Sequence, residues 1–178
     1  MKKLISLAIL FPLFIGCKTA HKSESLKIPA FILPAGLEDI SYHAKKNCKA
    51  FDANGGKTSI SGDFDGDGIV DHAKIVKKKE NGQEFLYVWL SSQEYKGIEL
   101  DEIGDLEALN NMSLSLGKHG TQIQDACGRG NEVLCEENDP KEIVFKNDFI
   151  WYTQCEAAAS IFYWNPQIKA FKRVWYSD

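Results

Sequence analysis

The chain has 178 residues, a length that suits one domain of ordinary size preceded by a short targeting segment. Hydrophobic residues make up 44% of the chain and charged residues 26%, which excludes a largely disordered or collagen-like protein. The formal net charge is −4, so we do not expect a nucleic-acid-binding domain, which needs an excess of Lys and Arg to neutralise phosphates.

The N-terminus has the pattern of a signal peptide. Lys2 and Lys3 precede an apolar run over residues 4–15 that is too short to span a membrane comfortably. The next residues complete the sequence Phe14-Ile15-Gly16-Cys17, which resembles the lipobox of bacterial lipoproteins. The resemblance implies cleavage after Gly16 and attachment of lipid to Cys17, and several acyl chains on one residue give stable membrane anchoring.

The residues after the lipobox bear on cleavage and location. An ordinary secretory signal cut after Ala20 is the alternative, but Lys18 stands where that cleavage needs a small residue. Lys18 after the cysteine also implies a lipoprotein of the cell envelope that is bound to the outer membrane and faces the periplasm if the cell is Gram-negative. We therefore divide the chain into a signal peptide (1–16), a lipidated cysteine with a flexible tether (17–27) and a single β-rich domain (28–178).

The remaining cysteines fit an exported protein. Apart from Cys17 there are four, and an even number in an exported chain predicts disulfides. Cys127 and Cys135 flank a Gly-containing segment that can turn back on itself, so we predict a Cys127–Cys135 bond and, by elimination, a Cys48–Cys155 bond. Free buried thiols are the alternative. A zinc site is less expected, because there is no CxxC pair and the histidines are scattered.

The strongest motif is an acidic loop. Asp63, Asp65, Asp67 and Asp71 lie close together in the sequence, and Gly68 permits a sharp turn between them. Carboxylates two residues apart on a tight loop can converge on a calcium ion, which takes roughly six to eight oxygen ligands. The main-chain carbonyl of Ile69 can supply a further oxygen. Without a cation these carboxylates would repel one another, so we predict a Ca²⁺ site formed by these four aspartates and the Ile69 carbonyl.

The surrounding sequence separates this loop from an EF-hand. Lys74 occupies the position of the bidentate Glu, and the flanking residues have the pattern of strands. The segment 61–73 resembles the calcium loop of FG-GAP and VCBS-type repeats, in which a DxDxDGxxD loop joins two antiparallel strands. The resemblance covers residues 58–91, without a second copy of the repeat, and implies the same ligands. It favours a structural Ca²⁺ over Mg²⁺, which demands stricter octahedral geometry.

Most of the domain is predicted to be β-structure. Patterned apolar residues indicate strands at 58–61, 73–77 and 84–90, with Asn81-Gly82 in a hairpin turn. Both faces of 84–90 are apolar, which favours a central strand. Further strands are predicted at 143–145, 149–152, 160–164 and 170–176, whereas 114–139 is predicted to be a loop. A short helix is expected over 38–50, and 98–110 is expected to be a short helix or an irregular connection.

These elements predict a mainly β fold, with α+β as the alternative. We expect a single antiparallel sheet or small sandwich with one calcium loop and one or two short helices. The C-terminal strands are rich in aromatic residues, which suit either a packed hairpin or an exposed surface for a protein or glycan. The candidate partner-binding residues are Trp164, Phe171, Trp175 and Tyr176.

The function classes follow from these features. We find no G-x-S-x-G or H-E-x-x-H motif, and no pair of carboxylates at a spacing that indicates glycan hydrolysis, so an enzyme is not expected. The chain resembles a small bacterial lipoprotein with one FG-GAP/VCBS-type calcium loop. The expected function is a lipid-anchored binding module, in one version an inhibitor or immunity protein against a cell-wall-active enzyme. The alternatives are a structural envelope lipoprotein and, less favoured, a peptidoglycan-acting enzyme.

Overall fold

The computed structural model describes residues 31–40, 57–103, 112–130, 141–155 and 157–177. These residues form strands and one short 3-10 turn, in the order β1 (Leu37–Asp39), β2 (Ser59–Gly62), β3 (Asp71–Lys78), β4 (Glu84–Trp89), η1 (Ser91–Gln93), β5 (Gly97–Ile103), β6 (Met112–Gly117), β7 (Gln122–Gln124), β8 (Glu142–Val144), β9 (Phe149–Gln154), β10 (Ala159–Asn165) and β11 (Ala170–Ser177). Within these ranges, no helix has the length and apolar character needed to cross a membrane.

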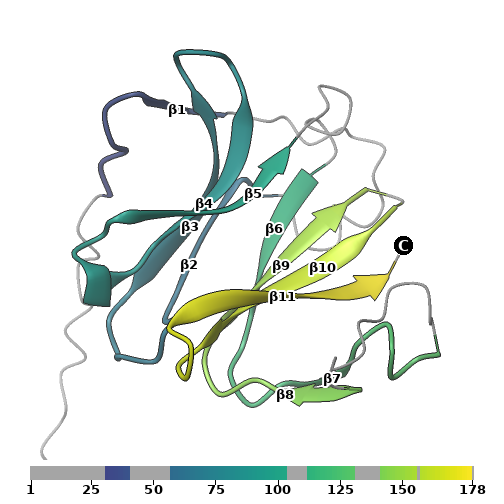
Figure 1. The fold of residues 1–178 in the computed structure, drawn as a ribbon. Coiled ribbons are helices and arrows are strands. Elements are labelled where there is room, and N and C mark those ends of the chain that lie inside the picture. Colours follow the sequence, from purple (N-terminus) through teal and green to yellow (C-terminus); the bar gives the residue numbers. More distant parts are fainter. Residues whose placement is uncertain (1–30, 41–56, 104–111, 131–140, 156, 178) are drawn as a thin grey trace, which may run out of the picture.

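Two antiparallel sheets face each other across a shared core (Figure 1). The first has the order β1-β3-β4-β5, with β2 beside β1 on the same edge of β3, and the second has the order β11-β10-β9-β6. A bridge between Lys57 and Leu114 joins the sheets where β2 approaches β6. The predicted mainly β fold with antiparallel sheets is confirmed.

The shared core accounts for the position of β4. Leu86 and Val88 on one face of β4 are fully buried and pack against the second sheet, including Leu114 and Ile150. On the other face Phe85, Tyr87 and Trp89 form a ladder of ring contacts. Because β4 buries apolar side chains on both faces and pairs with β3 and β5, its prediction as a central strand is confirmed.

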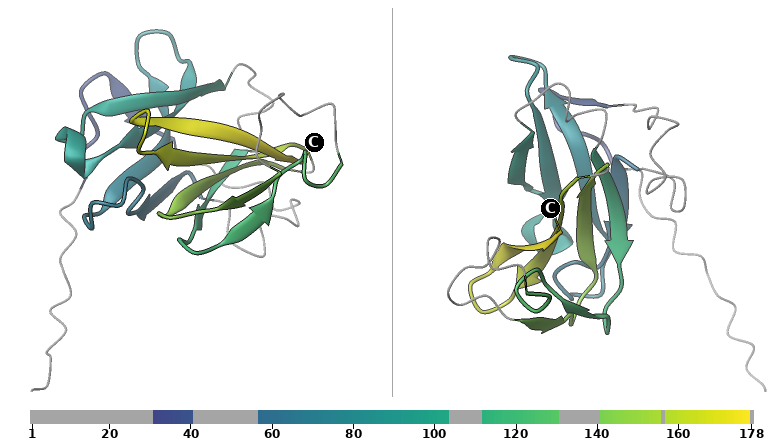
Figure 2. Two further views of the ribbon diagram at one scale, coloured as in Figure 1. Left: turned by 60° about the horizontal axis from the view of Figure 1, so that its bottom comes forward. Right: turned by 90° about the vertical axis from the view of Figure 1, so that its right-hand side faces the viewer.

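The second sheet is covered on its outer face as well. The two-stranded sheet of β7 and β8 lies below this sheet in Figure 1. Ile143 from β8 and Phe145 just beyond it pack against Phe149, Ile161 and Val174 of the second sheet. The small β7–β8 sheet therefore covers part of the outer face of the second sheet, and Figure 2 shows the domain from two further directions.

Two segments differ from the sequence-based expectations. Residues 97–103 form strand β5 instead of a helix or irregular connection, because Ile98 and Leu100 pack on the shared core while the backbone pairs with β4. Strand β7 and the last four residues of β6 lie in the range predicted as a loop, 114–139. Leu114 and Leu116 of β6 alternate with serines, and this period-two pattern places the leucines toward the core.

The predicted helix over 38–50 also needs correction in its described part. Glu38 and Asp39 belong to β1, which pairs antiparallel with β3. Their carboxylates form ion pairs with Lys77 and Lys74, at 3.1 Å and 2.5 Å. Residues 41–50 lie outside the described residues, as do the signal peptide, the tether and Cys17. No α-helix occurs among the described residues, where the only helical element is the 3-10 turn η1.

The described residues include two of the four cysteines that are predicted to form disulfides. Cys127 and Cys155 are both disulfide-bonded. Cys48 and Cys135 lie outside the described residues, so the pairings Cys127–Cys135 and Cys48–Cys155 stay predictions.

Candidate metal site

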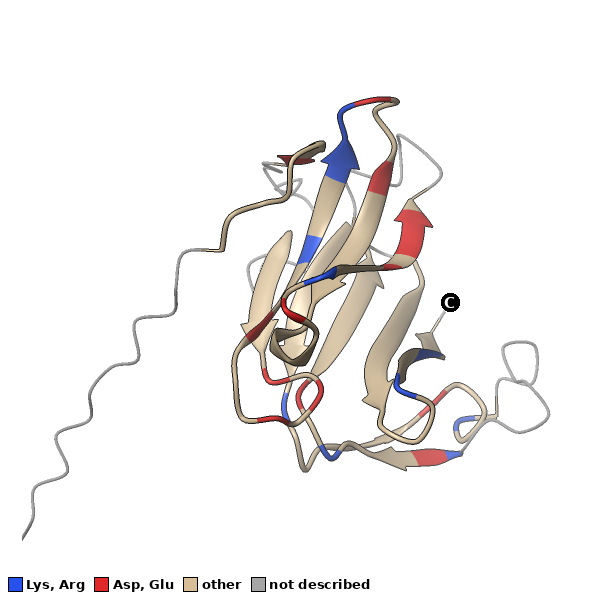
Figure 3. Ribbon diagram, turned by 60° about the vertical axis from the view of Figure 1, so that its left-hand side comes forward, with Lys and Arg blue, Asp and Glu red and all other residues tan. Residues whose placement is uncertain are grey.

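The acidic loop connects β2 to β3 at one end of the first sheet. Gly66 and Gly68 have φ angles of +83° and +85°, a left-handed conformation that glycine adopts without strain. The two bends fold the loop back over the start of β3. Acidic residues are gathered in this part of the molecule, as the red segments of Figure 3 show.

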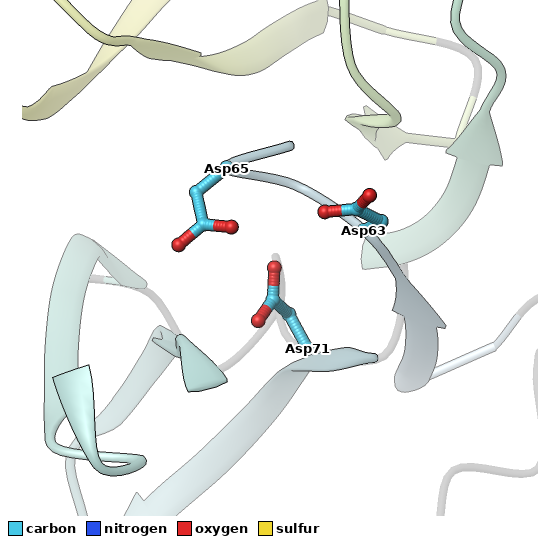
Figure 4. A group of neighbouring side chains, drawn as sticks. All are labelled: Asp63, Asp65 and Asp71. Atoms are coloured by element: carbon cyan, nitrogen blue, oxygen red, sulfur yellow. The ribbon is translucent and has the colours of Figure 1, made fainter. Parts of the chain in front are cut away.

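Three of the predicted ligands converge. Asp63, Asp65 and Asp71 each offer one carboxylate oxygen, and these oxygens all lie within 4.8 Å of one another. Figure 4 shows the three carboxylates pointing toward a common space. Asp71 is fully buried, whereas Asp63 and Asp65 are partly exposed. Because carboxylate oxygens are hard donors, this set fits Ca²⁺.

Backbone N–H groups hold two of these carboxylates in place. Asp63 accepts hydrogen bonds from the N–H groups of Gly66 (2.8 Å) and Gly68 (3.0 Å). Asp71 accepts from the N–H groups of Phe64 and Ser91, both at 2.8 Å. The ligand oxygens are therefore oriented by the fold of the loop itself.

The protonation of Asp71 reflects its environment. Burial raises the pKa of the Asp71 carboxyl to about 6, the N–H groups of Ser91 and Phe64 oppose this shift, and the nearby charge of Asp65 adds to it. A buried carboxylate beside a second carboxylate is costly to ionise unless a cation balances the charge. The local electrostatics thus favour a positive ion at this point.

The other two predicted ligands, Asp67 and the Ile69 carbonyl, are not in the converging group. The Asp67 carboxylate accepts from the Ile69 N–H (2.7 Å) and the Ser91 hydroxyl (2.7 Å). The Ile69 side chain is 56% exposed. The structure thus brings together Asp63, Asp65 and Asp71, while Asp67 and the Ile69 carbonyl remain predicted ligands.

The residues that surround the loop were not predicted from the sequence. The hydroxyls of Ser91 and Ser92 in η1 donate to Asp67 and Asp65, and the Tyr95 hydroxyl donates to the Val70 carbonyl (3.1 Å). The register of the predicted hairpin was a usable signal. Pairing of His72 with Trp89 places the residues after β4 next to the loop that precedes β3.

The turn between β8 and β9 contacts the loop from the second sheet. The Asn147 side-chain amide donates to the Phe64 carbonyl (3.2 Å), and the Asp148 N–H donates to the Asp63 carbonyl (3.1 Å). Asn147 also packs closely against Gly66, where an added Cβ would lie 2.6 Å from its Oδ1. The loop is therefore bonded to both sheets of the sandwich.

We expect Asn147→Ala to weaken calcium binding about three- to tenfold, because the loop loses one hydrogen bond that holds it in its binding conformation. Calorimetric titration of Ca²⁺ measures this change. Asn81→Ala is the matched control, since Asn81 lies in the β3–β4 turn, away from the loop. Equal affinities for the two variants would contradict a role for Asn147 in shaping the site.

The four aromatic partner-binding candidates do not share one surface. Trp164 and Phe171 are half-buried neighbours, with ring centroids 5.4 Å apart, and both line an opening of about 500 Å³ between β5 and β11. The Arg173 guanidinium, which bonds Asp101 at 3.2 Å, lies 4.1 Å from the centre of the Trp175 ring. Tyr176 lies on the opposite face of β11 and packs against Trp151. Trp164 and Phe171 thus line this opening together, whereas Trp175 lines a smaller one of about 160 Å³.

No model of a known protein family, no curated protein and no solved structure matches the chain.

Proposed function

We propose that this chain is a lipid-anchored, calcium-binding module of the cell envelope, in which the ion stabilises the two-sheet domain. The observation that carries the calcium assignment is the convergence of Asp63, Asp65 and Asp71 on one space. The spacing of the acidic motif in the sequence supports it independently. Bound Ca²⁺ supplies the positive charge that offsets the repulsion among these carboxylates.

The contacts of the loop support a structural role for the ion. The loop bonds to η1, which follows β4, through Ser91 and Ser92, and to the turn before β9 through Asn147 and Asp148. A cation held by Asp63, Asp65 and Asp71 therefore stabilises a loop on which both sheets converge. Because it ties together segments far apart in the sequence, its removal is expected to loosen this end of the domain.

Calcium titration with thermal unfolding tests this proposal on the chain without its predicted signal peptide (residues 17–178, Cys17→Ser). We expect one Ca²⁺ per chain. Calcium a hundredfold above its Kd should contribute about 2.7 kcal/mol to the free energy of unfolding, which raises Tm by roughly 5–10 °C over EDTA. Mg²⁺ at equal concentration should give a smaller rise. Identical melting curves in Ca²⁺ and EDTA would contradict a structural calcium ion.

Anchoring rests on the lipobox-like sequence and has its own test. In bacterial cells that express the full chain, we expect radiolabelled palmitate to be incorporated into the protein and the protein to fractionate with membranes. Cys17→Ala should abolish both, because it removes the acceptor of the lipid. Unchanged labelling of this variant would contradict the assignment of Cys17.

The binding-module part of the proposal draws on the openings beside the loop and between β5 and β11. One version is an inhibitor or immunity protein against a cell-wall-active enzyme. Capture of such an enzyme from periplasmic extract by the immobilised domain, in calcium, would support this version. A structural envelope lipoprotein is the alternative that an absence of any ligand or partner would favour.

A further inference from the structure

A cavity of about 350 Å³ opens next to the calcium loop, between the β8–β9 turn and the β10–β11 turn. Its wall includes Asp65, so it begins at a residue of the candidate metal site. Ligand sites in proteins typically occupy roughly 300–1,000 Å³, which makes this cavity large enough for a small organic molecule. Neither the predicted metal site nor the aromatic candidates taken together account for it.

The lining combines two kinds of side chain. The apolar part includes Ile143, Val144 and Pro166, together with the aromatic residues Tyr163 and Trp164. The polar part includes three planar amides, which are the side chains of Asn147, Asn165 and Gln167. Sugar rings match such a lining, because their C–H faces pack on apolar and aromatic surfaces while their hydroxyls both donate to and accept from amides.

The charges around the cavity select among ligands. Asp65 and Asp148 contribute carboxylates to the wall, and Lys146 contributes an ammonium group. Asp148 already bonds the Lys118 ammonium at 2.8 Å. An ion of either sign would therefore meet a like charge in the wall as well as an opposite one. A neutral ligand rich in hydroxyl groups avoids both kinds of repulsion.

Exposed apolar side chains lie on the segments that form this opening. Val144 in the cavity wall is 60% exposed, and Ile168, next to the lining residue Gln167, is 59% exposed. Ile69 in the calcium loop is also exposed. Three of the four large hydrophobic side chains that are most exposed in the described residues therefore lie on segments that form or adjoin this cavity.

From this combination we propose that the cavity binds a neutral mono- or disaccharide, with Gln167 and Asn147 as hydrogen-bonding residues and the apolar wall as the packing surface. The proposal rests on the proposed function as a binding module and gives that function a ligand class. It does not require that the calcium ion contact the saccharide, although Asp65 places the two sites side by side.

Saturation-transfer NMR on the chain without its signal peptide tests the proposal, in Ca²⁺ and in EDTA. The probes are N-acetylglucosamine, its β-1,4-linked dimer, and the matched set glucose, glucuronate and glucosamine. We expect saturation transfer to the neutral saccharides at millimolar concentration and weaker transfer to glucuronate and glucosamine. Absence of transfer to every neutral saccharide in both conditions, or preference for a charged member of the matched set, would overturn the proposal.

Two variants test whether the saccharide binds in this cavity. We expect Gln167→Ala to weaken the affinity for the best neutral probe about five- to tenfold, through the loss of a hydrogen bond. Gln122→Ala is the matched control, because Gln122 is an exposed glutamine on β7 that does not line the cavity. If both variants weakened saccharide binding equally, or if neither weakened it, the assignment of binding to this cavity would be overturned. Calorimetric Ca²⁺ binding of Gln167→Ala should be unchanged, so a failure of saccharide binding is distinguishable from a failure of the calcium site.

Discussion

Replacing Asp71 with alanine is expected to abolish calcium binding and to lower the free energy of unfolding by about 2–5 kcal/mol even in EDTA. Two effects add. The converging group loses its buried carboxylate. In addition, the N–H groups of Phe64 and Ser91 lose the acceptor they share, and buried donors without partners are costly. Denaturant unfolding in Ca²⁺ and in EDTA separates the two contributions.

Asp63→Ala and Asp39→Ala are the comparison variants for Asp71→Ala. Asp63 is a converging ligand that is partly exposed, so its removal should abolish calcium binding with a smaller loss of stability in EDTA. Asp39 lies on β1, pairs with Lys74 and is mostly exposed, so its removal should leave calcium affinity unchanged. Calcium binding by Asp71→Ala with near-normal affinity would show that the converging carboxylates are not the site.

The second large effect is expected at Gly117, where substitution by alanine should cost about 3 kcal/mol of stability. Gly117 pairs with Phe149 across β6 and β9. A Cβ on Gly117 would lie 2.1 Å from Cε2 of the Phe149 ring. The ring cannot retreat easily, because Phe149 is fully buried and stacks on Phe145 with centroids 3.9 Å apart. Urea unfolding of the variant measures the loss.

A double-mutant cycle tests the cause of this loss. Phe149→Leu removes the ring atoms nearest to the added Cβ, so Gly117→Ala should cost less in that background than in the natural chain. Ser115→Ala is the control on the same strand, because Ser115 is only partly buried. Additive effects of Gly117→Ala and Phe149→Leu would contradict a steric contact between them.

Local patterns in the sequence determined the central hairpin of the first sheet and the acidic loop before it. The hairpin of β3 and β4 carries an Asn-Gly turn between two apolar-patterned runs, and its strands lie within a residue or two of the predicted positions. The carboxylate spacing in residues 63–71 marked the loop where Asp63, Asp65 and Asp71 converge. Strands β8 to β11 were likewise predictable, because each has its own run of apolar or aromatic residues.

Only the tertiary structure decided the position of β5 and the contacts of the acidic loop, because both depend on residues that are distant in the sequence. The segment 97–103 carries acidic residues that suit a wet helix face, yet the free edge of β4 pairs with it as β5. Asn147 reaches the loop from 83 residues away, and Ser92 from 27. Hydrogen bonds between residues so far apart in the sequence produce no periodic pattern or characteristic spacing from which they could be predicted. The chain's local chemistry thus determined the ligand types of the candidate metal site, and the packing of the two sheets decided which residues orient those ligands and which cavity lies beside them.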